Sequence, residues 1–243
     1  MANKKVSELT TLLYSDGTEE LIVNDGGISK KMTQADLLDC HHPTSTSSLG
    51  VGRLTLDNNT GVSNTAVGYT ALRYNTTGER NTALGYRTLL NNTTGYRNSC
   101  VGHDSMFTNT TGYYNTAIGY QTLYFNTTGK YNVAVGMQSL YNNPTASGNT
   151  AVGYTALFSN TGSNNSALGY AALKDNTTGV SNTALGYNAL LYNTTGIYNN
   201  ATGYKALYYN TTGSKNTADG LQSLYNNTTG YENAANGDRK SVV

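Results

Sequence analysis

Short apolar runs alternate with polar, glycine-containing segments at a constant interval along most of the chain. The motif Asn-Thr-Ala-Val-Gly at residues 64–68 recurs, with small changes, ten more times. Its copies begin at Asn81, Asn98, Asn115, Asn132, Asn149, Asn165, Asn182, Asn199, Asn216 and Asn233. Nine intervals are 17 residues long, and one is 16 because the usual Asn-Thr-Thr-Gly is trimmed to Asn160-Thr161-Gly162. The consensus is N-T-A-[VL]-G-Y-x-A-L-x-x-N-T-T-G-x-x.

A period of 17 residues is too short for the common helical repeats, which need roughly 33–47 residues. Glycine every few residues also disfavours a helix. We predict two extended runs in each repeat, Thr-Ala-Val-Gly and Tyr-x-Ala-Leu, followed by an Asn-Thr-Thr-Gly turn. Each repeat is then one coil of an all-β solenoid (a β-roll or β-helix). About eleven coils at ~4.8 Å per strand would make a rod of about 53 Å.

Equivalent residues of a solenoid stack into columns. We predict a core ladder of apolar side chains at Val67, Leu84, Val101, Ile118, Val135, Val152, Leu168 and Leu185. A second apolar column runs from Leu72 through Leu89, Met106, Leu123 and Leu140 to Leu224. A structural ladder of side-chain amides is expected at Asn64, Asn81, Asn98, Asn115, Asn132, Asn149, Asn165 and Asn182. A tyrosine column beginning at Tyr69 is expected to stack its rings, with the hydroxyls in water.

Two large apolar side chains per coil make a thin core for an isolated rod. Stripes of small and aromatic residues running its whole length are surfaces that lateral association of identical chains would bury. We therefore expect a homo-oligomer.

The composition excludes several classes of protein. The sequence holds 38 Thr, 32 Asn, 27 Gly and 21 Tyr, but its charged residues make up 12% and its net charge is +1. A nucleic-acid partner is not expected, because the chain has no basic runs. Membrane insertion is not expected either, because no stretch approaches ~20 apolar residues. Two cysteines cannot form a disulfide framework.

Candidate chemistry is sparse. The acids of the repeats (Asp57, Glu79, Asp104, Asp175, Asp219, Glu232 and Asp238) form no evident pair of the kind that glycoside hydrolysis needs, and we interpret them as solvated loop residues. Cys40-His41-His42 lacks a second ligand pair and is interpreted as linker. Cys100 replaces Ala in its column and is interpreted as a small buried residue. The Asn-x-Thr sequons are explained by the turn. We predict no catalytic residue, no metal site and no cofactor.

The N-T-A-[VL]-G and N-S-A-L-G motifs, the latter at Asn165–Gly169, resemble the repeats in the heads of trimeric autotransporter adhesins. The longer N-T-A-L-G-Y-x-A-L-x-x-N-T-T-G form is still more similar to shaft repeats of bacteriophage tail-fibre proteins. The resemblance covers about residues 58–237. It implies a left-handed coil and a homotrimer.

The N-terminal segment also resembles phage fibre proteins, in which it attaches the fibre to the virion. The similar motifs are Val6-Ser7-Glu8-Leu9, Gly17-Thr18-Glu19-Glu20-Leu21-Ile22-Val23 and Gly27-Ile28-Ser29-Lys30-Lys31, ending in Asp36-Leu37. The resemblance implies virion docking through Val6, Leu9, Leu21, Val23, Ile28 and Leu37. From the residues themselves, Glu20–Val23 and Ile28–Met32 are predicted to form a hairpin around Asn24-Asp25-Gly26-Gly27. Thr33 is predicted to cap a short helix.

We expect four segments: a virion-attachment segment (1–40), a linker or degenerate first coil (41–57), the solenoid shaft (58–237) and a tail (238–243). The apolar ladder degrades to Thr202, Asp219 and Asn236, so we expect the last coils to be loose, capped or facing a wetter axis.

The expected function is a structural, non-enzymatic phage fibre on the virion surface. Its partners would be virion proteins at the N-terminus and a glycan or protein of the host surface. One alternative is a bacterial adhesin, which would need a signal peptide and an anchor that the sequence does not show. Others are an ice-active protein, whose threonine column Ser99, Val133 and Asn200 would interrupt, and a polysaccharide-cleaving tailspike.

Overall fold

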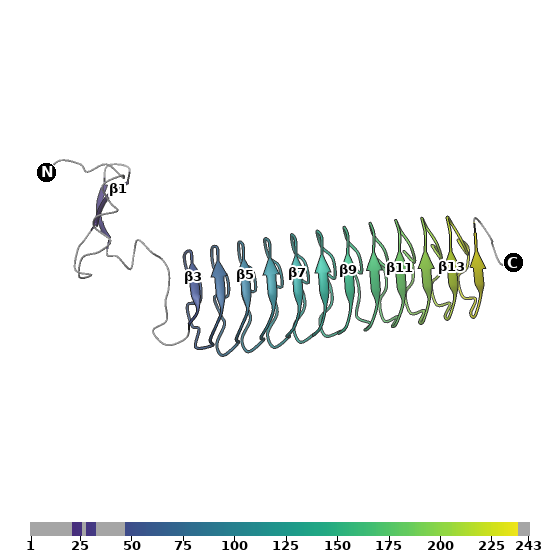
Figure 1. Ribbon diagram of the computed structural model, residues 1–243, viewed down its shortest axis with the longest axis horizontal. Helices are drawn as coiled ribbons and strands as arrows, with labels where there is room; N and C mark the ends of the chain where they lie inside the picture. The colour runs from purple at the N-terminus through teal and green to yellow at the C-terminus, as the bar shows by residue number, and fades with distance from the viewer. Residues whose placement is uncertain (1–20, 26–27, 33–46, 238–243) are drawn as a thin grey trace.

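A computed structural model of the chain describes residues 21–25, 28–32 and 47–237. Within residues 47–237, twelve strands of three residues form one parallel sheet, in which each strand pairs with the next along the chain. Figure 1 shows them following one another along the long axis of a rod. The strands are β3 (Leu49–Val51), β4 (Thr65–Val67), β5 (Thr82–Leu84), β6 (Ser99–Val101), β7 (Thr116–Ile118), β8 (Val133–Val135), β9 (Thr150–Val152), β10 (Ser166–Leu168), β11 (Thr183–Leu185), β12 (Asn200–Thr202), β13 (Thr217–Asp219) and β14 (Ala234–Asn236). The predicted all-β solenoid is confirmed.

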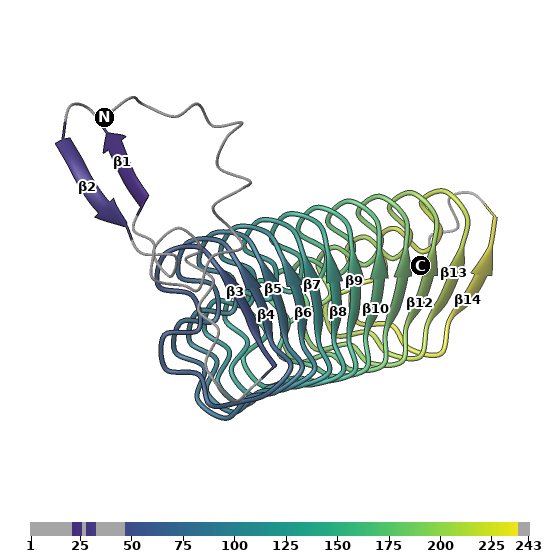
Figure 2. The ribbon, with the colours of Figure 1, turned by 60° about the vertical axis from the view of Figure 1, so that its left-hand side comes forward.

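The strand register repeats the sequence period. Thr65 of β4 lies opposite Thr82 of β5, 17 residues later. Across the short interval Thr150 of β9 lies opposite Ser166 of β10, so the missing residue is absorbed in the turn and not in the sheet. Figure 2 shows the strands lying side by side as one continuous sheet along the rod, with the rest of each coil behind them.

The solenoid begins earlier than the predicted boundary at residue 58. Leu49 of β3 pairs with Thr65 of β4, and the Leu56 side chain that follows is buried in the core. Ser48 occupies the position that Asn takes in later coils, where its hydroxyl accepts the Asn64 N–H at 3.0 Å. Residues 48–63 are therefore a degenerate first coil, which was one of the two alternatives for this segment.

Only the first of the two predicted extended runs is a strand. In the coil 115–131, Gln121 and Leu123 of the second run both have φ of 51°, in the left-handed region. Two residues with positive φ, two positions apart, recur in the same place in every coil from Leu54 to Leu224. The Tyr-x-Ala-Leu run therefore turns sharply instead of extending, which corrects the prediction. Its backbone still pairs between coils, because the Leu123 N–H donates to the Ser139 carbonyl at 3.0 Å.

The core of the coil is narrow and consists of small residues around one leucine column. Ala117 and Leu123 are fully buried, as are their counterparts along the rod. This leucine column comprises Leu56, Leu72, Leu89, Met106, Leu123, Leu140, Leu157, Leu173, Leu190, Leu207 and Leu224. The second predicted apolar column is thus confirmed as the core.

The N-terminal hairpin is confirmed, with the second strand as predicted and the first ending two residues later than predicted. Strand β1 (Leu21–Asp25) pairs antiparallel with β2 (Ile28–Met32), and Leu21 lies opposite Met32. Asn24 and Asp25, predicted as turn residues, belong to β1. The predicted helix after Thr33 and the tail 238–243 lie outside the described residues.

Candidate functional site

The predicted core ladder lies on the outside of the chain. Ile118 is 43% exposed and Leu168 is 50% exposed, whereas Ala117, between Thr116 and Ile118, is fully buried. Side chains alternate between the two faces of a strand, so a three-residue strand that points its alanine inward must point both flanking residues outward. The prediction that this column fills the core of the chain is wrong. The corrected residues are Val67, Leu84, Val101, Ile118, Val135, Val152, Leu168 and Leu185, to which the structure adds Val51. We call these nine residues the aliphatic column.

The aliphatic column becomes polar at its C-terminal end. Thr202, Asp219 and Asn236 continue it in β12, β13 and β14, and these strands pair as regularly as the others. The expectation of loose coils rested on placing these residues in the core. Since they lie on the outer face of the sheet, their polar groups meet no desolvation cost in the single chain.

A tyrosine column runs beside the aliphatic column, two residues further along each coil. The rings of Tyr154, Tyr170, Tyr187 and Tyr204 stack with centroids 5.1, 4.9 and 5.4 Å apart. These rings are about 42–47% exposed. The stacking predicted for this column is confirmed. The outer face of the strands carries the aliphatic column and, two residues before it, a column of mostly Thr and Ser, and the tyrosine column adds exposed rings beside them.

The predicted asparagine ladder is confirmed. Asn98 Oδ1 accepts from both the backbone N–H and the side-chain Nδ2 of Asn115, and the Asn115 side chain also donates to the Gly129 carbonyl at 2.9 Å. The predicted members of the ladder are at most 1% exposed. They are Asn64, Asn81, Asn98, Asn115, Asn132, Asn149, Asn165 and Asn182. These side chains hold the coils together and are not accessible to a ligand.

A second ladder, which the sequence reasoning missed, is formed by the asparagine of each Asn-Thr-Thr-Gly turn. Asn126 Nδ2 donates to Asn109 Oδ1 at 2.8 Å and to the Gly129 carbonyl at 3.2 Å. Its recurrence at the same position of successive coils could have shown this, because identical side chains one coil apart can pair with each other. The sequon asparagines are thus buried donors, which agrees with explaining the sequons by structure.

Asp104 does not fit the prediction of a solvated loop acid. Its side chain is 3% exposed and forms a bidentate ion pair with Arg87, with both contacts at 2.7 Å. His103 Nδ1 lies 3.2 Å from the same carboxylate. The hydrogen bond to Asp104 raises the pKa of Arg87. Arg87 also lies over the Phe107 ring at 4.9 Å, so the cluster is a stabilising contact between coils.

The remaining candidate residues are scattered. Glu79 and Glu232 are exposed and lie near Arg80 and Lys215, respectively. Cys100 is fully buried with its thiol 3.2 Å from Met106 Sδ, and burial raises the pKa of the thiol, which confirms its interpretation as a small core residue. Within the described residues, no group of three or more His, Cys, Asp or Glu side chains could hold a metal ion.

The predicted docking residues fall partly in the hairpin. Leu21 and Val23 lie in β1 and Ile28 lies in β2. Val6, Leu9 and Leu37, like Cys40-His41-His42, lie outside the described residues.

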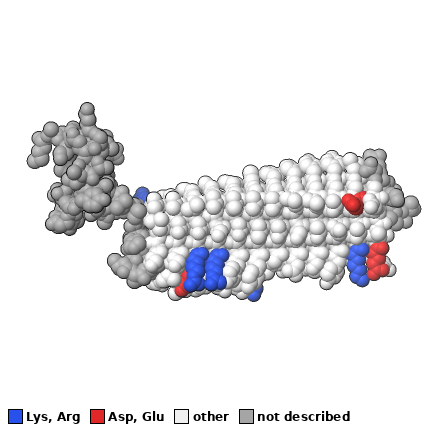
Figure 3. All heavy atoms as spheres, in the orientation of Figure 1, with Lys and Arg blue, Asp and Glu red and all other residues white. Residues whose placement is uncertain are grey.

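Charged side chains are few on the surface of the rod. Figure 3 shows a face on which they gather at the lower edge and near the C-terminal end, with most of the length uncharged. None of the described segments forms a helix that is long and apolar enough to cross a membrane. Comparison of the chain with protein-family models, with curated proteins and with solved structures returned no match.

Proposed function

We propose that the chain is the structural, non-enzymatic rod of a phage fibre, in which three copies associate side by side along their length. The N-terminal segment would dock to the virion and the solenoid would project toward the host. The observation that carries the proposal is the aliphatic column, which lies on the outer sheet face of nine successive coils, exposed in six of them and half-buried at Leu84, Val135 and Val152. An apolar surface of that extent is typical of a protein–protein interface.

The column itself favours identical copies in parallel register. It is apolar from Val51 to Leu185 and polar from Thr202 to Asn236. In an antiparallel pair the apolar coils at one end of a rod would face the polar coils of its neighbour. In parallel copies the apolar coils of one chain lie against the apolar coils of its neighbour, and the polar coils lie against polar coils. A rotation axis along the rod allows this arrangement. The choice of three copies over two rests on the resemblance to fibre shafts.

Association can be tested by sedimentation of the full chain. We expect a mass three times the chain mass of 25.9 kDa at micromolar concentration. Ile118→Asp should shift the mass toward the monomer because it introduces a charge into the apolar face. Thr128→Asp, which adds the same charge to an exposed turn residue, should leave the trimer intact. A wild-type chain that sediments as a monomer would contradict association. If Ile118→Asp sedimented with the same mass as the wild type, the aliphatic column would not be part of the interface.

The virion assignment needs a separate test. Antibodies to residues 1–40 and to residues 47–237 would be applied to purified phage particles. We expect labelling of the shaft by the second antibody and no labelling by the first, whose epitope would be covered at the docking point. The chain's absence from particles would refute the virion role without bearing on the trimer.

A further inference from the structure

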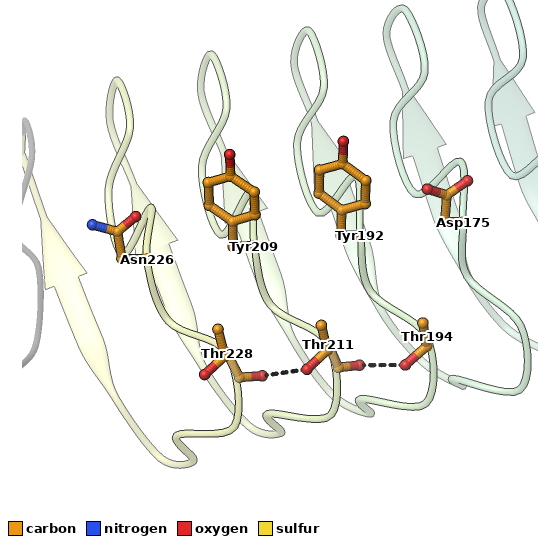
Figure 4. Close-up of a pocket in the computed structure, with 7 residues that line it drawn as sticks. All are labelled: Asp175, Tyr192, Thr194, Tyr209, Thr211, Asn226 and Thr228. Carbon is orange, nitrogen blue, oxygen red and sulfur yellow. Dashed lines mark hydrogen bonds between the residues drawn. The ribbon is translucent and has the colours of Figure 1, made fainter.

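A shallow groove of about 570 Å³ runs along the rod on the turn side of four successive coils. One wall is formed by Asp175, Tyr192, Tyr209 and Asn226, which occupy the same position in their coils. The other wall is formed by Thr194, Thr211 and Thr228. Figure 4 shows the two walls as two rows of side chains that run side by side along the rod.

The two tyrosines form a rigid pair. Their ring centroids are 5.6 Å apart and their planes differ by 3°, and Figure 4 shows both rings turned the same way. Each ring packs at nearly a right angle against Tyr208, at 5.1 Å for Tyr192 and 4.7 Å for Tyr209. A hydrogen bond to the Tyr225 side chain raises the pKa of Tyr209. The rings are therefore held in place yet remain 39% and 42% exposed.

The polar groups of the groove favour a ligand rich in hydroxyls. The Thr194 and Thr211 hydroxyls donate their protons to the Thr211 and Thr228 carbonyls at 3.0 and 3.1 Å. Their oxygens can therefore only accept a further hydrogen bond, which a ligand must donate. Asp175 also accepts, while the Asn226 amide can both donate and accept.

The groove lining contains no cation and one carboxylate, so phosphate and acidic sugars are disfavoured. An apolar peptide face would leave the carboxylate and the amide without partners.

Two consecutive aromatic residues at this position, Tyr192 and Tyr209, are not a general feature of the repeat. The same position in the earlier coils is occupied by Asn58, Tyr74, Asn91, Thr108, Phe125, Asn142 and Ser159, where no two aromatic residues are consecutive. Lateral association of rods would use a column that continues through many coils, as the aliphatic column does over nine. A short aromatic platform with a polar group at each end is instead typical of a ligand site.

We propose that this groove binds a neutral, unbranched oligosaccharide lying along the rod, with two successive sugar rings packed on Tyr192 and Tyr209. The apolar faces of the sugars would cover the aromatic rings, and their hydroxyls would pair with Asp175, Asn226 and the threonine oxygens. The groove is made by residues of one chain, so this inference goes beyond the fibre proposal and does not depend on virion attachment.

The experiment is a titration of the full-length chain with neutral hexasaccharides (cello-, xylo-, malto- and mannohexaose) and with acidic oligogalacturonate, followed by NMR or calorimetry. We expect at least one neutral hexasaccharide to bind and oligogalacturonate not to bind. Tyr192→Ala and Tyr209→Ala should each weaken binding about tenfold. Phe125→Ala is the matched control, because Phe125 occupies the same column position, is 40% exposed and packs on Tyr124 at 4.7 Å.

A gain-of-function variant keeps the test independent of folding losses. Asn226→Tyr would exchange the Asn226 amide for a third ring, and binding of the same hexasaccharide should strengthen if packing on the added ring outweighs the lost amide contact. Three results would overturn the proposal: no binding by any neutral sugar, binding that survives Tyr192→Ala/Tyr209→Ala, or equal binding of oligogalacturonate. A fall in sedimenting mass in the double variant would also overturn it, by making the groove a contact between copies.

Discussion

Asn98 and Asn115, one coil apart, are joined by two hydrogen bonds to a single oxygen. Asn98 Oδ1 accepts the Asn115 backbone N–H at 3.0 Å and the Asn115 Nδ2–H at 3.1 Å. Asn115 Oδ1 then accepts the same pair from Asn132. Each amide therefore satisfies a buried backbone donor of the next coil, which no apolar side chain could do.

Asn115→Ala should destabilise the rod by about 1–3 kcal/mol, because it leaves the buried Asn132 N–H without its acceptor, while the Gly129 carbonyl still accepts from Asn126. Denaturant unfolding followed by circular dichroism would measure the loss. The control is Asn233→Ala, at a half-buried position in the last coil that only donates to Asn216 and Asn227. If Asn115→Ala and Asn233→Ala lowered the free energy of unfolding equally, the hydrogen bonds that Asn115 accepts from the next coil would contribute nothing to stability.

The leucine and aliphatic columns should respond differently to truncation. Leu123→Ala should cost about 2–5 kcal/mol at any chain concentration, because it leaves a cavity inside one coil. Ile118→Ala acts on an exposed side chain, so its cost should appear only where the chains associate and should vary with chain concentration. Unfolding curves at several concentrations would separate the two. If Ile118→Ala lowered the free energy of unfolding by the same amount at every chain concentration, Ile118 would contribute to the core of the single chain and not to an interface.

The features that follow from stacking alone could be predicted from the sequence. A 17-residue period fixes the register, since Ala117 must lie beside Ala134 whatever path the rest of the coil takes. The Asn115 ladder follows for the same reason, because identical side chains one coil apart can pair with each other.

The path within a coil could not be predicted in the same way. Leu123 and Gln121 adopt positive φ, a conformation in which non-glycine residues are uncommon and which nothing in the residue pattern indicates. The residue pattern predicts Ile118 in the core, whereas its side chain lies on the outer face of the sheet. The groove was missed for the same reason: Tyr192 and Tyr209 are visible as a pair in the sequence, but their position opposite Thr194 and Thr211 depends on how the turn folds.

Gly119 should tolerate no side chain. Its φ is 139°, and a Cβ there would come within 2.7 Å of the Gly136 carbonyl oxygen in the next coil. Gly119→Ala should therefore cost more than the 1–3 kcal/mol of backbone strain alone. Gly237→Ala isolates the strain, because φ is 106° there and, within residues 47–237, no atom other than those of its chain neighbour lies within 4 Å of the added Cβ. Thermal unfolding should show a larger loss of stability in Gly119→Ala than in Gly237→Ala. A larger loss in Gly237→Ala would contradict the close approach of the coils at Gly119.

Cys100 should be unreactive in the folded rod. Burial raises the pKa of its thiol, and reagents attack the thiolate. In a Cys40→Ser chain, Ellman's reagent should label Cys100 only after unfolding, at a rate that follows the opening of its coil. Cys100→Ala should be tolerated, because Ala occupies the equivalent position in both neighbouring coils. Fast labelling of the native chain would mean that this coil opens far more readily than its burial indicates.

Alkaline pH should destabilise the C-terminal coils through Tyr208. Burial, with the Tyr192 side-chain hydrogen bond as a second cause, raises the pKa of Tyr208 to about 12, while an unfolded tyrosine titrates near pH 10. Because the folded state holds the proton more tightly, this contribution to stability is complete below about pH 10 and is lost as the pH rises toward about 12. Unfolding free energies measured across this range should fall less steeply in Tyr208→Phe than in the wild type.

The pKa of Tyr113 is shifted in the opposite direction to that of Tyr208, so Tyr113 serves as its control. A hydrogen bond from Lys130 lowers the pKa of Tyr113, so its contribution to stability appears as the pH rises toward the unfolded value near 10. Tyr113→Phe should therefore make the alkaline loss of stability steeper, where Tyr208→Phe makes it shallower. If both variants changed the slope in the same direction, a general effect of removing a hydroxyl would account for the result, and the burial of Tyr208 would not set the alkaline limit of the rod.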